Sequence, residues 1–194
     1  MHAKDPTGRS EMTFPEISIV NVVATATLDR PVDLESLREL FPHEVVHDAA
    51  IYGGRAAYFK SEEMQGKVVI FPSGKMISVG TKSTEKTQHE LALVASHLEE
   101  AGVAKLKKSP VKIRNIVATA DIGFEVNLDE VKNGKGTYII YEPEQFPGAI
   151  IRLNLSEKMK ATILLFSSGK IVCVGLKDRK DIDRAVHRLL GVIS

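Results

Sequence analysis

The pattern of apolar and polar residues along the chain predicts a mixture of strands and helices. Residues 17–28 alternate between the two kinds and are rich in Val, Ile and Thr, which predicts a strand. Asp33 precedes leucines at helical spacing, so a short helix should begin there with Asp33 as its N-cap. Apolar stretches then predict further strands, at 55–59, 67–71 and 75–81. An amphipathic pattern from Leu91 to Leu98 predicts a closing helix. The expected order is strand, helix, four strands, helix, and the apolar stretches locate three of those four strands.

This order of elements occurs twice, because two sequence blocks recur. IVNVVATATL at 19–28 returns as IRNIVATADI at 113–122, and FPSGKMISVG at 71–80 returns as FSSGKIVCVG at 166–175. A period of about 95 residues is too long for a solenoid unit and indicates a duplicated half-domain. The predicted organisation is an N-terminal tail, a first repeat, a basic connector and a second repeat, at 1–15, 16–103, 104–109 and 110–194.

The duplicated order predicts a sheet with one face free of helices. Consecutive strands joined by short links are mainly antiparallel, and two helices in each repeat can cover only one face of the sheet. We call the other face the open face. Strand alternation places apolar residues and one Asn of each repeat there: Asn21, Val23, Val69, Ile77 and Val79 in the first, and Asn115, Val117, Leu164, Val172 and Val174 in the second. An exposed apolar face of this size is typical of a binding surface.

The repeated blocks, together with YEPEQFPG at 141–148, resemble the TATA-box-binding protein family, especially its archaeal form. The resemblance extends from Glu16 to about Leu190. It implies an α+β fold, a duplicated saddle with a curved ten-stranded antiparallel sheet and helices on the convex face. It also implies that the concave face binds and bends A·T-rich promoter DNA through the minor groove. No activity as an enzyme is implied.

The resemblance also assigns roles to individual residues. The ten open-face residues named above match positions that contact bases, and the minor groove offers mainly acceptors that an Asn amide can bind. Four aromatic residues match positions that insert between base steps: Tyr52, Phe71, Phe146 and Phe166. Polar residues at the rim match phosphate contacts: Ser73, Ser168, Arg152, Lys82 and Lys177. The alternatives are internally bonded asparagines, phenylalanines of the core, and rim side chains that are only solvated.

The resemblance implies partners besides double-stranded DNA. Acidic and amide side chains in the loop at 141–148, which we call the second stirrup, match contacts to transcription factor B: Glu142, Glu144 and Gln145. These side chains could instead be ordinary surface charge. RNA polymerase would be recruited indirectly, and a homodimer is allowed when the protein is free of DNA. No cofactor and no membrane partner is expected.

Two departures from the family pattern favour an alternative function. Val79 and Val174 stand where the family usually has Thr, and the first stirrup, HDAAIYGG at 47–54, lacks the Pro-Glu pair and the Phe. The first repeat should therefore hold DNA more weakly. The alternative is a divergent regulator that acts mainly through protein contacts and binds promoters poorly. An accessory domain of a nuclease or glycosylase is disfavoured, because two full repeats occupy the chain.

Composition excludes several other classes of protein. The net charge is +1, with 26 basic and 25 acidic residues, so bulk charge cannot hold a polyanion. Cys173 is the single cysteine, which excludes an internal disulfide and a cysteine-rich zinc site. The six histidines lack metal-binding spacing, and the SGK turns lack the glycines of a phosphate-binding loop. Without a signal-peptide pattern, we expect a cytoplasmic protein of the archaeal nucleoid, or a nuclear one in a eukaryote.

Overall fold

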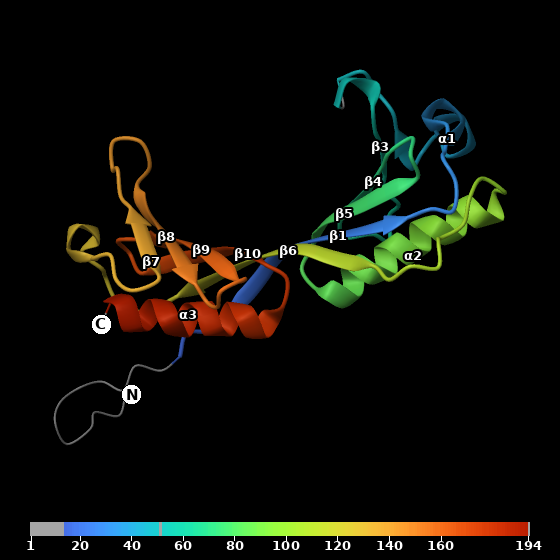
Figure 1. Cartoon of the computed structure of the whole chain (residues 1–194). Helices are drawn as coiled ribbons and strands as arrows, with labels where there is room; N and C mark the ends of the chain where they lie inside the picture. The colour runs from blue at the N-terminus through green and yellow to red at the C-terminus, as the bar shows by residue number, and fades with distance from the viewer. Residues whose placement is uncertain (1–13, 51, 194) are drawn as a thin grey trace. The chain divides into compact units, whose positions relative to one another are not determined.

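The computed structural model describes residues 14–50 and 52–193 (Figure 1). The predicted tail, residues 1–15, lies almost entirely outside the described residues. The elements of the first half follow the predicted order: β1 (Ser18–Thr27), α1 (Leu34–Leu40), β2 (Val45–Val46), η1 (Tyr52–Gly54), β3 (Ala57–Phe59), β4 (Lys67–Ile70), β5 (Lys75–Thr81) and α2 (Thr84–Glu100). The second half repeats it: β6 (Lys112–Asp121), η2 (Leu128–Glu130), β7 (Thr137–Ile140), β8 (Gly148–Asn154), β9 (Lys160–Phe166), β10 (Lys170–Leu176) and α3 (Arg179–Ile193).

The strands form one ten-stranded sheet in the order β2-β3-β4-β5-β1-β6-β10-β9-β8-β7. The pairs β1–β5, β2–β3, β3–β4, β4–β5, β7–β8 and β8–β9 are antiparallel. The short strand β2 is the one that the apolar pattern did not locate, because two residues are too few to show alternation. The ten-stranded sheet expected from the sequence is confirmed.

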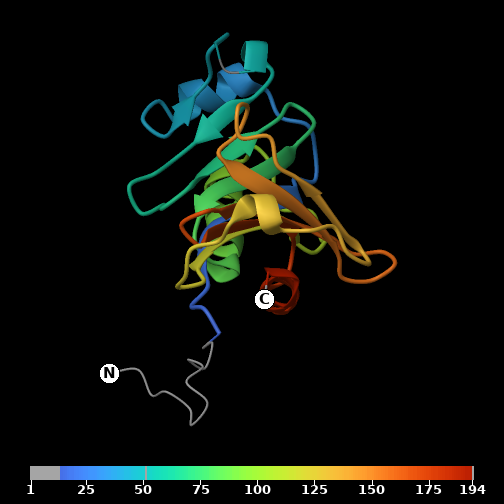
Figure 2. The ribbon, with the colours of Figure 1, turned by 90° about the vertical axis from the view of Figure 1, so that its left-hand side faces the viewer.

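The chain divides into two compact units, each with its own helix layer. One unit consists of Ile19–Val117 and Val174–Asp178, and the other of Ala118–Cys173 and Arg179–Ser194 with the segment that ends at Ser18. In the first unit α2 packs on β4 and β5, and α1 packs on β2 (Figures 1 and 2). In the second unit α3 packs on β8 and β9. Among the described residues, each helix layer therefore covers a single face of its strands.

Local sequence explains where the helices begin. The Asp33 carboxylate accepts a hydrogen bond from the Ser36 N–H at 3.1 Å, so Asp33 is the N-cap of α1 as predicted. Ser83 caps α2 in the same way, through Lys86 N–H. The second half has only the 3₁₀ turn η2 in place of α1, since NGKG follows within a few residues and ends the helical pattern.

The buried side chains on the helix side are almost all apolar. The core of the first unit includes Leu37, Phe59, Ile70 and Leu98, each completely or almost completely buried. Cys173 is also buried on this side, as the alternation of β10 predicts, and burial raises the pKa of its thiol to about 12. This thiol is therefore a small apolar core group rather than a nucleophile. No helix among the described residues is long and apolar enough to cross a membrane.

The two SGK turns are built on glycines that no other residue can replace without strain. Gly74 and Gly169 have φ values of 81° and 84°, in the left-handed region. A Cβ atom on Gly74 would lie 2.5 Å from the Arg30 carbonyl oxygen, and one on Gly169 would lie 2.2 Å from that of Phe124. The turns therefore need glycine for backbone conformation and for close packing, and not for phosphate binding.

We expect Gly169→Ala to lower the free energy of unfolding by roughly 2–4 kcal/mol, because it adds a steric clash to the left-handed backbone penalty. Gly123→Ala is the matched control, since Gly123 has a φ of 83° with nothing within 4 Å of an added Cβ. It should cost only about 1–2 kcal/mol. Urea unfolding of both variants measures the difference, and equal losses would show that the contact with Phe124 is not restrictive.

Candidate nucleic-acid interface

The open face is built from side chains that the strand register aligns across the sheet. Thr25 lies opposite Ile77, Ile77 opposite Val69, and Val69 opposite Tyr58, so these four residues form one row across β1, β5, β4 and β3. On the second half, Leu164 lies opposite Ile150. The predicted base-contacting residues are half-buried, with one exception. They line the face that carries no helix in either unit.

Val69 is the exception, because only 5% of its surface is exposed. It has Ile77 on one side and the large Tyr58 ring on the other. Val69 therefore offers little surface for contact with a base.

The two predicted asparagines occupy matching positions and make matching hydrogen bonds. Asn21 Oδ1 accepts a bond from Gly80 N at 2.9 Å, and Asn115 Oδ1 accepts one from Gly175 N at 2.9 Å. Gly80 lies at a β-bulge, where Val79 and Gly80 together oppose Val23, and its φ is 94°. An unpaired bulge N–H needs an acceptor, and the Asn side chain supplies it.

This bond fixes how each amide group is oriented. A backbone N–H can only donate, so the amide oxygen must face it, and the NH₂ group points to the opposite side. The internal hydrogen bond of each asparagine therefore involves only the amide oxygen. Within the described part of the chain, each half-buried amide keeps its two N–H donors for a ligand on the open face.

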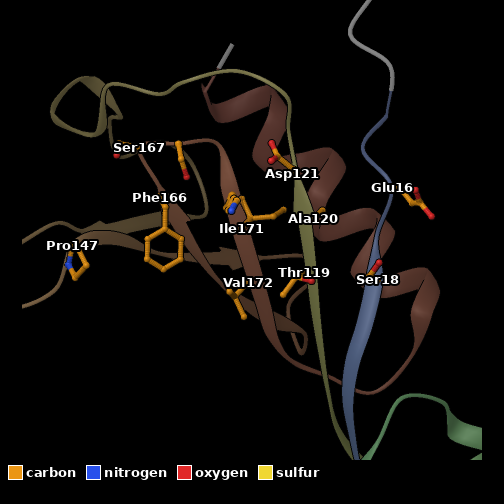
Figure 3. Close-up of a pocket in the computed structure, with 12 residues that line it drawn as sticks. Glu16, Ser18, Thr119, Ala120, Asp121, Pro147, Phe166, Ser167, Ile171 and Val172 are labelled. Atoms are coloured by element: carbon orange, nitrogen blue, oxygen red, sulfur yellow. The ribbon is translucent and has the colours of Figure 1, made fainter.

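Two aromatic rings of the second half lie together at the edge of the open face. The Phe146 and Phe166 ring centroids are 5.7 Å apart in an edge-to-face arrangement. Gly148 lies directly opposite Phe166, and a Cβ there would come within 2.9 Å of the Phe146 ring and 3.1 Å of the Phe166 ring. The Phe166 ring borders a hollow of about 750 Å³, together with Pro147, Thr119 and Val172 (Figure 3). Both rings are half-buried and so are not core residues.

The first half does not reproduce this pair. The ring of Tyr52 lies 6.4 Å from that of Tyr58, while the ring of Phe71 has Lys75 Nζ at 6.0 Å. The register explains the difference: Ala57 opposes Ile70, so Ala56 takes the place opposite Phe71 that Gly148 takes opposite Phe166. Phe146 precedes its glycine by two residues, whereas Tyr52 precedes Ala56 by four. Tyr52 is thus exposed, with a φ of 48°, two residues further from the strand.

The residues predicted to contact phosphate are exposed around the open face. Ser73 and Ser168 lie in the SGK turns, and Lys82 and Lys177 directly follow β5 and β10. Arg152 is exposed in β8, opposite Tyr138 on one side and Thr162 on the other. Their positions allow contact with a ligand at the edge of the sheet.

The two stirrups differ in charge and in local structure. In the second stirrup the N–H groups of Gln145 and Phe146 both bond to the Glu142 carbonyl, at 2.9 and 3.0 Å, forming a tight turn. This turn leaves Glu142, Glu144 and Gln145 exposed. In the first stirrup Asp48 instead accepts a bond from Ala50 N at 2.8 Å. The first stirrup thus offers one carboxylate, and this carboxylate already accepts a hydrogen bond from the backbone of its own loop.

Sequence reasoning missed three side-chain features near the base-contacting residues. Tyr58 lies on the open face opposite Val69, Lys67 Nζ lies 3.9 Å from the centre of the Tyr58 ring, and Arg114 Nε donates to Thr25 Oγ1 at 2.9 Å. The repeat alignment held one usable signal, because IRN in the second block replaces IVN in the first. Within the described residues, no group of His, Cys, Asp and Glu side chains could hold a metal ion.

Comparisons with known proteins agree on one family. The family model described as transcription factor TFIID, or TATA-binding protein, matches residues 16–101 and 110–194. The TATA-box-binding protein of Methanocaldococcus jannaschii is 35% identical over 191 residues, covering 93% of this chain and 94% of that protein. That of Pyrococcus furiosus is 37% identical over 181 residues, covering 93% and 91%. A solved structure, Methanococcus jannaschii TBP, matches with a TM-score of 0.76 at 35% identity, covering 92% of this chain and 98% of its own.

Proposed function

The chain belongs to the TATA-box-binding protein family, and from that premise we propose that it is a general transcription initiation factor whose open face binds A·T-rich promoter DNA. Members of this family are DNA-binding proteins and not enzymes. As such a factor, the protein would act on the DNA of the nucleoid.

The paired Asn21 and Asn115 amides are the observation that carries this proposal. Each presents N–H donors on an apolar face, and the minor groove of A·T pairs presents only acceptors, A N3 and T O2. A G·C pair adds the amino group of guanine, which would meet apolar side chains without a partner. The open face therefore favours A·T pairs, because its amides bind their acceptors and its apolar side chains disfavour the guanine amino group.

The Phe146–Phe166 pair supports bending of the bound DNA. Apolar wedges that enter between base steps unstack them, and bent DNA then covers more protein surface; this family is a known example of that mechanism. The pair lies at the edge of the open face of its own unit, where an apolar wedge can enter a base step.

A gel-shift experiment tests the proposed function. We expect tighter binding to a duplex with an A·T-rich box than to one with a G·C box, and a modest salt dependence, because few rim cations neutralise phosphates. Equal affinity for both duplexes, with a steep salt dependence, would contradict minor-groove recognition. If the protein binds transcription factor B but shows no specific DNA binding, that result would favour the divergent regulator instead.

We further propose that the second stirrup binds transcription factor B and, through it, recruits RNA polymerase. The support is its exposed pair of carboxylates, Glu142 and Glu144, against the single internally bonded Asp48 of the first stirrup. Charge complementarity of this kind sets orientation more than affinity.

Without DNA, the apolar open face is a surface on which a second copy of the protein could pack. In that case the sedimentation of the free protein would depend on its concentration.

We expect Glu144→Arg to leave the binary complex with DNA nearly unchanged but to weaken the ternary complex with transcription factor B at least tenfold. The reason is that a favourable charge contact becomes a like-charge contact. Asp48→Arg is the matched control in the first stirrup and should leave the ternary complex intact. Gel shifts with added factor measure both, and normal ternary complexes in Glu142→Arg and Glu144→Arg would show that the factor docks elsewhere.

A further inference from the structure

Glu90 is a charged residue buried where α2 packs on the sheet of its unit. Only 3% of its surface is exposed. Its Oε1 accepts a hydrogen bond from Gly66 N at 2.8 Å, and this bond joins α2 to the residue that directly precedes β4. A buried carboxylate costs free energy unless hydrogen bonds compensate it, so the bond to Gly66 offsets part of the cost of this burial.

Gly66 lies between this carboxylate and the bulge of β5. A Cβ atom on Gly66 would collide with the Val79 carbonyl oxygen and would lie 2.9 Å from Glu90 Oε2. A Cβ atom on Gly80 would lie 3.2 Å from Gly66 Cα. The backbones of the two glycines are therefore packed against each other, and a displacement of Gly66 would displace the bulge.

The bulge in turn orients the Asn21 amide. Gly80 N donates to Asn21 Oδ1 at 2.9 Å, and the NH₂ group points to the opposite side. A line of three contacts thus runs from the helix side of the sheet to its open face: Glu90 to Gly66, Gly66 to Gly80, and Gly80 to Asn21. Packed backbones transmit displacements because protein interiors have few voids. The orientation of the Asn21 N–H donors therefore depends on where Glu90 holds Gly66.

The second repeat holds the corresponding backbone by strand pairing instead. A shift of 95 residues relates Gly66 to Ala161 and Glu90 to Ala185, and both alanines are buried. Ala161 belongs to β9 and pairs in register with Leu153 of β8. Gly66 instead lies just before the first residue of β4, outside the strand. The bond to Glu90 thus replaces a strand contact that this part of the first repeat lacks.

We infer that Glu90 is a positioning residue for the base-contacting amide of Asn21. The inference deepens the proposed function and rests on it, because the amide has a base to contact only when DNA lies on the open face. Glu90 itself lies on the helix side and acts through Gly66 and the bulge. Removing its carboxylate should loosen the bulge, so that the Asn21 N–H donors are no longer held toward the minor groove. Asn115 should not respond, since Ala185 takes the place of Glu90 in its repeat.

The first measurement uses the full chain without DNA. In Glu90→Ala, the side-chain NH₂ signals of Asn21 in a proton–nitrogen correlation spectrum should move, while those of Asn115 stay in place. Glu90→Gln keeps an oxygen that can accept from Gly66 N, so it should restore the Asn21 signals. Leu98→Ala is the matched control, because it removes a buried side chain about two turns further along α2, away from Gly66, and also lowers stability.

The second measurement is the ratio of the affinities for the A·T-box and G·C-box duplexes. We expect Glu90→Ala to lower this ratio at least about threefold, because one of two amide contacts, each worth roughly tenfold, is no longer well oriented. Glu90→Gln should keep the ratio of the unaltered protein, and so should Leu98→Ala at a temperature where it is folded. A merely structural role of Glu90 would lower stability in both alanine variants and leave the ratio and the Asn21 signals unchanged.

The outcomes separate this inference from the proposed function. Asn21 signals that stay in place in Glu90→Ala, or that move as much in Leu98→Ala, would overturn the inference, and so would an unchanged affinity ratio. Absence of A·T preference in the unaltered protein would instead overturn the proposed function, and the spectra would still decide whether Glu90 orients the amide. If Glu90→Ala does not fold, Glu90→Asp withdraws the carboxylate from Gly66, and unchanged Asn21 signals in that variant would overturn the inference too.

Discussion

Asn115→Asp should weaken binding to an A·T box by roughly 10- to 100-fold while the fold stays intact. The Asp side chain keeps the oxygen that accepts from Gly175 N, so the bulge N–H remains bonded. It lacks the NH₂ group, and it turns a carboxylate oxygen toward the acceptors of the minor groove. The loss of such a base contact is worth about 1–3 kcal/mol, and each 1.4 kcal/mol is a factor of ten.

The matched control separates base contact from folding. Asn115→Ala removes the donor and also leaves the Gly175 N–H without its partner, so this variant should lose both specific binding and thermal stability. Asn21→Asp should behave as Asn115→Asp, since Asn21 makes the same bond to Gly80. The interpretation fails if the Asp variants bind A·T and G·C boxes with the same fractional loss, because that result would assign the asparagines a structural role only.

Loss of either ring of the Phe146–Phe166 pair should reduce DNA bending more than loss of Tyr52. The paired rings are half-buried and in mutual contact, so removing one leaves the other without support. Each apolar wedge offsets an unstacking cost of about a few kcal/mol per base step. Phe146→Ala and Phe166→Ala should therefore lower the affinity for the A·T box at least tenfold and increase the distance between the ends of the bound duplex. Energy transfer between labels at the two ends measures this distance.

Tyr52→Ala serves as the comparison in the other half. The Tyr52 ring is exposed and contacts Tyr58, and its hydroxyl would have to lose water on entering a base step. We therefore expect less than a threefold change in affinity and a small change in energy transfer. A defect as large as that of Phe166→Ala would show that Tyr52 is a full wedge despite its different register.

The sequence predicted the open face well because the evidence for it is local and repeated. Alternation within β1 separates Asn21 and Val23 from the buried Val22 and Ala24, and the structure has the same division. The duplication adds a second, independent copy of each pattern. Strand order within the halves followed from short links, which leave few choices for neighbouring strands.

What the sequence could not supply were features that depend on register between strands. Aligning the stirrups by their glycines matches Tyr52 with Phe146, whereas hydrogen-bonded pairing places Tyr52 two residues further away. The bulge at Gly80 is likewise a property of two strands, so the bond to Asn21 could not be derived from β1 alone. The contacts of Lys67 and Arg114 have the same origin, since each crosses to another strand.

Binding to a box of inosine–cytosine pairs tests the central claim most directly. Inosine lacks the 2-amino group of guanine, so an I·C pair resembles A·T in the minor groove and G·C in the major groove. If the open face recognises the minor groove, the protein should bind and bend an I·C box nearly as well as the A·T box, and the G·C box at least tenfold more weakly. Binding to the I·C box as weak as to the G·C box would contradict recognition through the minor groove.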